Sequence, residues 1–312
     1  MNQAKTVTVK SVTALLIMVL LCLSLFAVTT DTRADPTRPA GWIDSFIGTP
    51  DHYVLQRGSN RLPVKFYMPV HDGDLIIVNH VGHSLVLALS ENDSVLITVK
   101  NSPYRAKALY EAPTLAGNLM DWAGDWLTGL AGKSPQRNTA MLVTRSIGSR
   151  LHTPLLNDGA GKIAAGKTGL CLAWVGGRPK YRITVTQPYN HPAPLLDVAT
   201  SATSGCWRIP KSSPGEYGLI ISDDSGYRVK TNVHMVSEQE IPRLPQELSE
   251  SSLSSEAKTT LYAAWLASLR DTDWALQAYQ LVVPLANIHP PAASLVSALE
   301  EGSRPQGMEV SR

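Results

Sequence analysis

Three short apolar runs, separated by turn residues, decide the fold of the first half of this chain. They are Leu75-Ile76-Ile77-Val78, Leu85-Val86-Leu87-Ala88-Leu89 and Val95-Leu96-Ile97-Thr98-Val99. A fourth run, Val64-Lys65-Phe66-Tyr67-Met68, precedes them, and the breaks between the runs are rich in Gly, Asp, Asn and Ser. This spacing predicts strands joined by tight turns. We therefore expect a small β-meander or roll over residues 62–109, preceded by irregular chain over residues 35–61.

One turn in this region carries a more specific pattern. Val70-His71-Asp72-Gly73-Asp74-Leu75-Ile76 places Gly-Asp and an apolar pair at the start of a strand, with a polar turn and a second β-pair following. This order resembles the FecR-type domain over about fifty residues of the chain. The resemblance implies a periplasmic, non-catalytic module that serves in sensing or assembly.

The β pattern returns between residues 139 and 237. Candidate strands cover residues 141–143, 170–174, 181–185, 195–198, 206–209, 217–221 and 229–236. Short strands at this density predict a β-sandwich. The stretch from Pro214 to Leu219, followed by Asp223-Asp224-Ser225-Gly226, resembles the late hairpin of immunoglobulin-like domains. That resemblance implies that Tyr217 is the corner tyrosine.

Residues 114–132 change to a helical period. Leu115, Leu119, Trp122, Trp126, Leu127 and Leu130 recur at the spacing of one helix face. The helix either packs between the flanking β-units or docks a partner or the membrane surface. Its polar face is acidic, which argues against binding to anionic lipid.

The end of the chain reads as a polar linker followed by a helical segment over residues 256–301. One helix is striped by Leu261, Trp265 and Leu269, and Asp271 or Thr272 caps a second that contains Trp274. A third helix covers residues 291–300. The first two resemble half of a tetratricopeptide unit, which implies a face that packs on the β-domain or is offered to a partner. The sequence thus predicts a mainly β protein with accessory helices, and it marks four candidate interaction residues: Trp122, Trp126, Trp265 and Trp274.

Residues 1–34 have the layout of a secretory signal. Lys5 and Lys10 precede an apolar run over residues 12–28, and Thr32-Arg33-Ala34 provides a small-residue exit. The run approaches the length of a membrane span, so the segment is either a cleaved signal peptide or an uncleaved N-terminal anchor. Both alternatives place the rest of the chain outside the cytoplasm, and we expect it in the periplasm.

The charge balance excludes several partners. The chain has 28 basic and 26 acidic residues, and removing Lys5, Lys10, Arg33 and Asp31 with residues 1–34 leaves 25 of each. A neutral domain has no electrostatic surface for nucleic acid or for anionic lipid. We expect membrane contact only through the N-terminal segment, if that segment is uncleaved.

Two cysteines remain after residue 34. Cys171 and Cys206 are candidates for one structural disulfide, because an oxidising compartment favours such bridges. The alternative is two separate buried thiols.

Gly161-Lys162-Ile163-Ala164-Ala165-Gly166-Lys167-Thr168 matches the phosphate-loop pattern. Phosphate binding also requires a buried strand before the loop and a helix after it. Here a turn precedes the motif, and the strand-like run at residues 170–174 follows it. We therefore interpret the segment as the lead-in to the sandwich and expect no nucleotide.

The sequence gives little support for a metal site or a catalytic site. The densest group of metal-capable side chains is His71, Asp72, Asp74, His80 and His83, and we interpret its histidines as exposed turn residues. His80 and His83 would face one ion only if Gly82 made a turn between them. No nucleophile elbow is present, and Cys171 lies in an apolar run that suits a buried residue. We expect no metal site, no cofactor and no catalytic residue.

These observations favour a non-enzymatic interaction or sensing protein of the cell envelope whose partner is another envelope protein. The alternative is a carbohydrate-binding or hydrolytic envelope protein. Exposed Trp rings beside one groove would favour the alternative, whereas Trp residues buried where modules meet would favour the binding protein. A membrane-anchored signalling subunit is a third class, which depends only on whether the first segment is retained.

Overall fold

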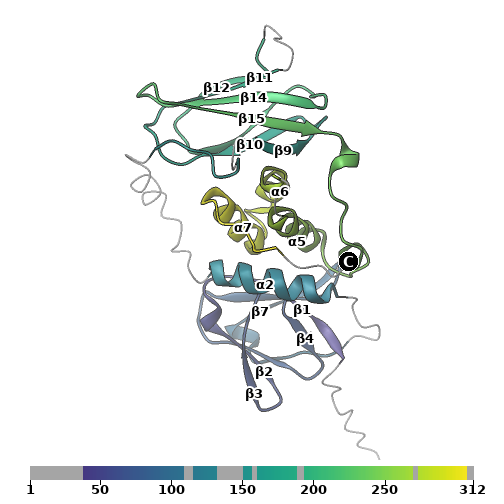
Figure 1. The fold of residues 1–312 in the computed structure, drawn as a ribbon. Helices are drawn as coiled ribbons and strands as arrows, with labels where there is room; N and C mark the ends of the chain where they lie inside the picture. The colour runs from purple at the N-terminus through teal and green to yellow at the C-terminus, as the bar shows by residue number, and fades with distance from the viewer. Residues whose placement is uncertain are drawn as a thin grey trace, which may run out of the picture. The chain divides into compact units, whose positions relative to one another are not determined.

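Two four-stranded antiparallel sheets form the first half of the chain. In the first sheet the order is β4 (Pro69–His71), β1 (Pro39–Phe46), β6 (Ser84–Ser90) and β7 (Asp93–Thr98). In the second sheet the order is β3 (Asn60–Pro63), β2 (Tyr53–Arg57), β5 (Leu75–Val78) and β8 (Tyr104–Arg105). The computed structural model describes residues 38–108, 115–131, 150–156, 160–187, 193–269 and 273–307, and its elements are labelled in Figure 1. We call these eight strands the first β-unit.

The core of the first β-unit lies between its two sheets. Phe46 of β1 stacks on Phe66, with ring centroids 4.2 Å apart, and contacts Tyr53 of β2 at 5.3 Å. The apolar residues of β5, β6 and β7 expected to face a core are buried, as Ile76, Leu85 and Ile97 illustrate. The strands expected at residues 75–78, 85–89 and 95–99 are therefore confirmed to within two residues at their ends.

Residues 35–61 are not irregular, and that expectation is wrong. They contain β1 and β2, and β1 is a central strand between β4 and β6. Gly41 permits this position, because a Cβ atom there would lie 2.1 Å from the Ala88 carbonyl oxygen of β6. Closely approaching backbones thus explain a glycine that interrupts the strand pattern.

The strand expected at residues 64–68 is absent from that stretch. Phe66 and Tyr67 are both buried, and they lie in a turn rather than in a strand. Tyr67 has φ of 60°, in the left-handed region, so the chain turns there.

The Gly73-Asp74 turn is a structural feature of the first β-unit. Gly73 has φ of 84°, and the buried Asp74 carboxylate accepts hydrogen bonds from the Arg57 guanidinium at 2.9 Å and the His71 amide at 2.8 Å. Asp72 also has a structural role, because its side chain accepts from the Ala108 amide at 2.9 Å. Both carboxylates are therefore engaged within the fold.

Seven strands form the second β-unit, over residues 160–236. The five-stranded sheet has the order β12 (Leu196–Thr200), β11 (Tyr181–Thr186), β14 (Gly215–Ser222), β15 (Arg228–Val236) and β9 (Ala160–Ala164). A two-stranded sheet pairs β10 (Gly169–Ala173) with β13 (Ser204–Arg208). Six of the seven expected strands are present within a few residues of their expected bounds, and residues 141–143 lie outside the described residues. β9 was not expected; it pairs in parallel with β15.

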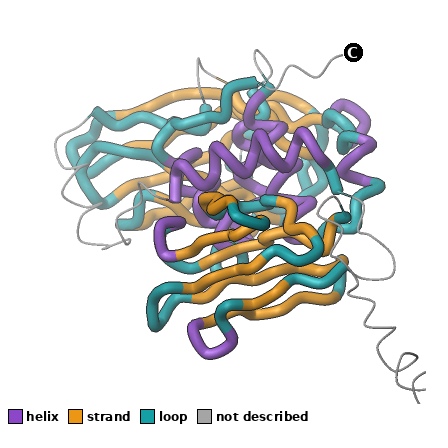
Figure 2. Tube along the Cα trace, turned by 90° about the horizontal axis from the view of Figure 1, so that it is seen from below, coloured by secondary structure: helices purple, strands orange, loops and turns teal. Residues whose placement is uncertain are grey.

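The helices are α2 (Gly117–Ala131), α4 (Gln246–Ser249), α5 (Ser255–Ser268), α6 (Ala275–Val282) and α7 (Pro290–Glu300). Among the described residues, four short 3-10 turns accompany them: η1 (Pro50–His52), η2 (Val99–Asn101), η4 (Glu238–Glu240) and η5 (Val283–Leu285). With strands in orange and helices in purple, Figure 2 shows the mainly β fold with accessory helices that the sequence predicts, and this fold class is confirmed. The expected caps Asp271 and Thr272 lie outside the described residues.

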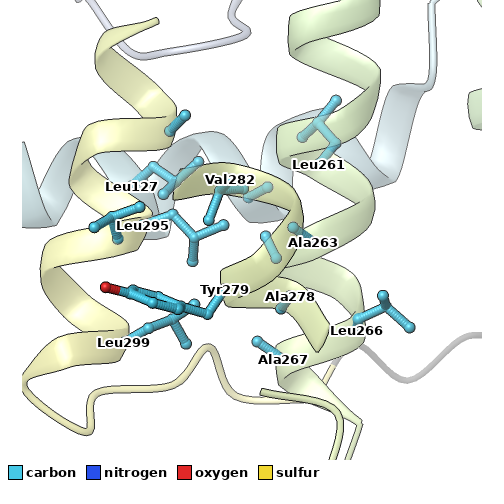
Figure 3. Packing of buried hydrophobic residues seen from close by; sticks show 14 of the residues in the cluster. Leu127, Leu261, Ala263, Leu266, Ala267, Ala278, Tyr279, Val282, Leu295 and Leu299 are labelled. Atoms are coloured by element: carbon cyan, nitrogen blue, oxygen red, sulfur yellow. The ribbon is translucent and has the colours of Figure 1, made fainter. Parts of the chain in front are cut away.

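Helix α2 packs on the C-terminal helices and on the Phe66 turn of the first β-unit, so the expectation that it lies between the two β-units is wrong. It contacts α5 and α7, and Figure 3 shows Leu127 of α2 near Leu295 of α7 and Val282 of α6. Helix α7 in turn contacts β1, and α6 contacts β9 and β10. The C-terminal helices therefore have contacts with both β-units. Within the described ranges, no helix is long and apolar enough to cross a membrane.

Candidate functional site

A buried carboxylate, imidazole and phenol meet where the first β-unit contacts the C-terminal helices. Asp44 supplies the carboxylate from a β-bulge in β1. The pairing of β1 with β6 passes from Ile43 opposite Leu87 to Ser45 opposite Val86, so Asp44 is the extra residue. A bulge turns a side chain away from its ordinary strand direction. In this way Asp44 reaches a helix rather than the neighbouring strand.

Tyr67 supplies the phenol from the turn before β4. Its amide donates to the Ile43 carbonyl at 2.7 Å, and the Met68 carbonyl accepts from the Ile43 amide at 2.9 Å. These two bonds hold the turn on β1 although a non-glycine residue in the left-handed region costs about 1–3 kcal/mol. The Tyr67 side chain has no exposed surface.

His289 supplies the imidazole from the residue before α7. Pro290 and Pro291 follow it, and a residue before proline favours the extended backbone that His289 adopts. The Ala293 amide donates to the His289 carbonyl at 3.1 Å, which begins the helix. Only 3% of His289 is exposed.

The three groups form a chain of contacts that we call the Asp44–His289–Tyr67 junction. His289 Nε2 lies 3.0 Å from the Tyr67 hydroxyl, and His289 Nδ1 lies 3.6 Å from Asp44 Oδ2. Ser254, which caps α5, donates from its hydroxyl to Asp44 Oδ1 at 3.3 Å. The junction therefore joins β1 and the Tyr67 turn to the amino ends of both α5 and α7.

Burial sets the protonation of the junction. It lowers the pKa of His289, which the Asp44 and Glu256 carboxylates partly oppose. The positive amino end of α7 also disfavours an imidazolium. Burial raises the pKa of Asp44, opposed by His289, and it raises the pKa of the Tyr67 hydroxyl well above its usual range. A neutral imidazole that accepts the Tyr67 proton at Nε2 satisfies all three groups.

The order carboxylate, imidazole, hydroxyl is also that of a catalytic relay. A nucleophile must be reached by its substrate, whereas the Tyr67 hydroxyl is fully buried. The geometry therefore suits a structural connection whose strength depends on protonation. The sequence did not reveal this group: His289 has no partner nearby in the chain, and its contacts come from residues more than two hundred positions away.

The four candidate interaction tryptophans do not form an exposed surface. Trp274 is 5% exposed, and Trp122, Trp126 and Trp265 are half-buried against the core. Trp122 Nε1 donates to the Gln306 carbonyl at 3.0 Å, and Trp265 stacks on Tyr262. The remaining tryptophans, at 42, 174 and 207, are buried or half-buried as well. All seven tryptophans of the chain therefore pack against the core, and none of them is in the exposed class.

Cys171 and Cys206 form the disulfide for which the sequence made them candidates. They are register partners on β10 and β13, with Cα atoms 4.0 Å apart. Cys171 is buried and Cys206 is exposed. The bridge holds together the two strands of the smaller sheet.

The phosphate-loop motif begins inside β9. Gly161 to Ala164 are strand residues, Gly166 turns with φ of 76°, and β10 follows. Because a strand takes the place of the helix that would bind phosphate, the structure agrees with our interpretation of the segment as part of the sandwich.

His80 and His83 lie on one turn, which is the condition under which both side chains could face one ion. The His83 amide donates to the His80 carbonyl at 3.3 Å, and Gly82 has φ of 85°. His52 of η1 is not among the metal-capable residues named from the sequence. Its ring packs against those of His80 and His83, with centroids 4.3 Å and 4.2 Å away. Across the described ranges, no three His, Cys, Asp or Glu side chains are arranged to hold a metal ion.

This histidine turn lies in an exposed apolar area at one end of the first β-unit. Val81 and Ile47 are 88% and 58% exposed, and the Ile47 amide donates to the Ser84 carbonyl at 3.0 Å. The Tyr53 hydroxyl lies 2.6 Å and 2.8 Å from the carbonyl oxygens of Ile47 and Ser84, which fixes the two segments together. Val99 is 40% exposed. It directly follows Thr98, which lies opposite Ser84 in the pairing of β6 with β7. We call this area the histidine tip, and it consists of Ile47, His52, His80, Val81, His83 and Val99.

Comparison with known proteins leaves the chain without an assigned relative. No family model and no curated protein matches it. Among solved structures, a Bacteroides ovatus mixed-linkage glucan utilization locus protein, SGBP-B, in complex with a heptasaccharide has 12% identity and a TM-score of 0.18. The extracellular domain of a putative one component system from B. thetaiotaomicron has 10% identity and a TM-score of 0.19.

The chain spans well under half of each of these structures. Its match covers 59% of this chain and 38% of the first structure, and 64% of this chain and 30% of the second. At these TM-scores neither likeness supports a statement about the fold or function of the chain.

Proposed function

We propose that this protein is a non-enzymatic binding or sensing component of the cell envelope, located in the periplasm, whose partner is another envelope protein. The observation that carries the proposal is the contrast between tryptophans packed inside the fold and an exposed apolar histidine tip. Exposed apolar areas rimmed by polar residues mark interaction sites. The secretory layout of residues 1–34 supports the location.

A FecR-like role for the first β-unit has structural support. The Gly73-Asp74 turn of the family pattern has a buried carboxylate that holds Arg57, and β2 with a turn at Gly58 precedes it. Such a module would be a sensing or assembly element rather than a catalyst. Because the Tyr67 hydroxyl is fully buried, the junction itself offers no accessible nucleophile.

An immunoglobulin-like second β-unit is supported by Tyr217. Its hydroxyl donates to the Ser213 carbonyl, four residues upstream, at 3.0 Å. A corner tyrosine bonds the backbone in this direction. The Cys171–Cys206 bridge joins β10 and β13 within the smaller sheet, so it differs from the inter-sheet bridge of antibody domains.

The histidine tip is the surface we assign to the partner. Of the seven exposed large apolar side chains among the described residues, four lie on strands of the first β-unit or in the segments that connect them: Ile47, Val81, Leu96 and Val99. Apolar side chains beside imidazoles suit a protein surface with its own apolar patch.

A sugar-binding role has less support. Sugar rings stack on exposed aromatic faces, and Tyr227 is the one aromatic residue among the exposed large apolar side chains of the described ranges. The Arg150 guanidinium already lies 5.5 Å above the Tyr227 ring and bonds its hydroxyl.

Site-specific photo-cross-linking in cells tests the proposal. A photoreactive residue at Val81 should give a cross-link to an envelope protein, identified by mass spectrometry, and Ile47→Asp should weaken it several-fold. A photoreactive residue at Ile288, which is 70% exposed and outside the tip, is the matched control. Alanine at Trp122 and Trp126 is a poorer test, because both rings pack on the core.

A Val81-specific protein cross-link that Ile47→Asp weakens would support the proposal. Equal cross-linking from Val81 and Ile288, or none from Val81, would overturn the assignment of the tip. Recovery of a bound glycan by the purified protein would instead favour the carbohydrate-binding alternative.

A further inference from the structure

We propose that the Asp44–His289–Tyr67 junction is an acid-sensitive latch that holds the first β-unit on the C-terminal helices while His289 is neutral and loosens when the imidazole gains a proton. This inference concerns a different part of the molecule from the histidine tip and does not depend on the partner that binds there. It follows from contacts that join three distant segments of the chain through one titratable ring.

The hydrogen bond between Tyr67 and His289 Nε2 depends on the protonation of the ring. The Tyr67 hydroxyl lies 3.0 Å from His289 Nε2 and is protonated over the whole physiological range, because burial raises its pKa. A neutral imidazole whose proton is on Nδ1, facing Asp44, accepts the Tyr67 proton at Nε2. An imidazolium has a donor at each ring nitrogen and can no longer accept it.

Protonation of His289 would also place a positive charge in the protein interior. The groups that face His289 are Asp44 on β1, Tyr67 on its turn and Glu256 on α5, and the ring lies at the positive amino end of α7. The Asp44 carboxylate can balance one proton on the ring. Protonation of the ring nevertheless removes the acceptor of the Tyr67 proton and places a desolvated cation at the positive end of α7, with the Asp44 carboxylate 3.6 Å away.

The pH interval follows from the directions of the two shifts. Burial lowers the pKa of His289 from 6.5 and raises the pKa of Asp44 from 3.8. The unfolded chain therefore takes up the histidine proton at 6.5, before the folded chain does, and the contribution of His289 to stability is lost as the pH falls from there to the folded pKa. The raised pKa of Asp44 acts in the opposite sense, because the folded state protonates it first and gains stability as the pH falls toward 3.8. The latch is therefore weakest in mild acid between these two values.

Amide hydrogen exchange measures the opening directly. Two reporter amides belong to the junction: Tyr67, which donates to the Ile43 carbonyl, and Ala293, which donates to the His289 carbonyl. On acidification from about pH 7.5 to about pH 5.5, exchange corrected for its intrinsic rate should accelerate roughly tenfold at both amides. Amides of β14, which pair with β11 in the second β-unit, should keep their protection.

His289→Gln is the decisive variant. Its side-chain oxygen can accept the Tyr67 proton but cannot be protonated, so the acid-induced acceleration should disappear. His234→Gln changes a histidine of β15 and should retain it. Acceleration that persists in His289→Gln, or acceleration that is equally large in β14, would overturn the proposal.

A direct titration keeps the proposal falsifiable if His289→Gln does not fold. The midpoint of the His289 ring signals in the NMR spectrum of the unmodified protein should lie below pH 6.5, and the acceleration of exchange should level off as the pH falls through that midpoint. A midpoint at or above 6.5, or one unrelated to the exchange, would overturn the latch.

Discussion

The Gln280 side chain closes the outer edge of β10 by hydrogen bonding both backbone groups of Cys171. Its Oε1 accepts from the Cys171 amide at 2.8 Å, and its Nε2 donates to the Cys171 carbonyl at 2.7 Å. Gln277, one turn earlier on α6, accepts from the Ala164 amide of β9 at 2.8 Å. Two glutamines on one helix thus take the place of a neighbouring strand along two sheet edges. An edge that would otherwise pair with another chain is used to hold the helical segment.

Gln280→Ala should destabilise the docking of α6. The substitution leaves a backbone donor and acceptor without protein partners, and such a loss costs about 1–3 kcal/mol. Gln56→Ala removes an exposed glutamine with one bond to Gly58 and should change stability by less than about 0.5 kcal/mol. Urea unfolding of both variants measures the difference. Equal effects would show that the Gln280 clasp adds nothing to stability.

Removal of the disulfide should lower stability more. Cys171 and Cys206 are 35 positions apart, and the loop-entropy relation gives a bridge of this separation roughly 3 to 4 kcal/mol. The paired variant with alanine at both cysteines should show this loss in thermal unfolding under oxidising conditions, and it should show no further change on adding a reductant. Unmodified protein that loses nothing on reduction would contradict the expectation.

The second β-unit and the helices were largely predictable because their apolar periods are simple. Six strands and the helices α2, α5, α6 and α7 follow from alternating or helical patterns, and tight turns separate them. β9 was missed because Gly161 and Lys162 read as a loop motif. Its strand is stabilised by pairing with β15, seventy residues later, which no local pattern reveals.

The first β-unit and the junction depended on contacts that the local sequence does not encode. Gly41 reads as a strand breaker until the close approach of Ala88 is known. The Tyr67 turn reads as a strand because Val64 to Met68 are mostly β-favouring residues, and tertiary contacts with Ile43 override that preference. His52 joins His80 and His83 only through the folding of η1 against a distant turn.

His52 of the histidine tip should titrate below the ordinary range of an imidazole. Local desolvation, and then the charges of His83 and His80, lower the pKa of His52 below its ordinary 6.5, and Asp51 opposes them. An NMR titration should place the His52 midpoint below 6.5, and His83→Ala should move it upward because one opposing charge is lost. His234→Ala, on β15, should not move it. A midpoint that His83→Ala leaves in place would mean that the rings do not interact in solution.

The Gly73-Asp74 turn should be sensitive to loss of charge. Asp74→Asn keeps an acceptor for the His71 amide but leaves Arg57 without its ion-pair partner, 2.9 Å away in the structure. Because the carboxylate is 2% exposed, the loss should be roughly 2 to 4 kcal/mol. Asp93→Asn, at an exposed turn position, is the control and should be nearly neutral. Chemical unfolding of the two variants measures the difference. Equal unfolding midpoints would show that the Arg57–Asp74 ion pair does not stabilise the fold.

Two glycines of α2 should respond in opposite directions to the same substitution. A Cβ atom at Gly124 would lie 2.2 Å from the Phe66 carbonyl oxygen, whereas one at Gly129 meets no atom within 4 Å. Gly124→Ala must therefore push α2 away from the turn that carries Tyr67, and it would strain the bond from the Phe66 amide to the Thr128 hydroxyl. We expect a loss of about 1–3 kcal/mol. Gly129→Ala should instead stabilise the helix by about 0.5–1 kcal/mol, because alanine restricts the unfolded chain and favours helix. Thermal unfolding distinguishes the two signs, and a stabilised Gly124→Ala variant would show that α2 does not pack this closely on the first β-unit.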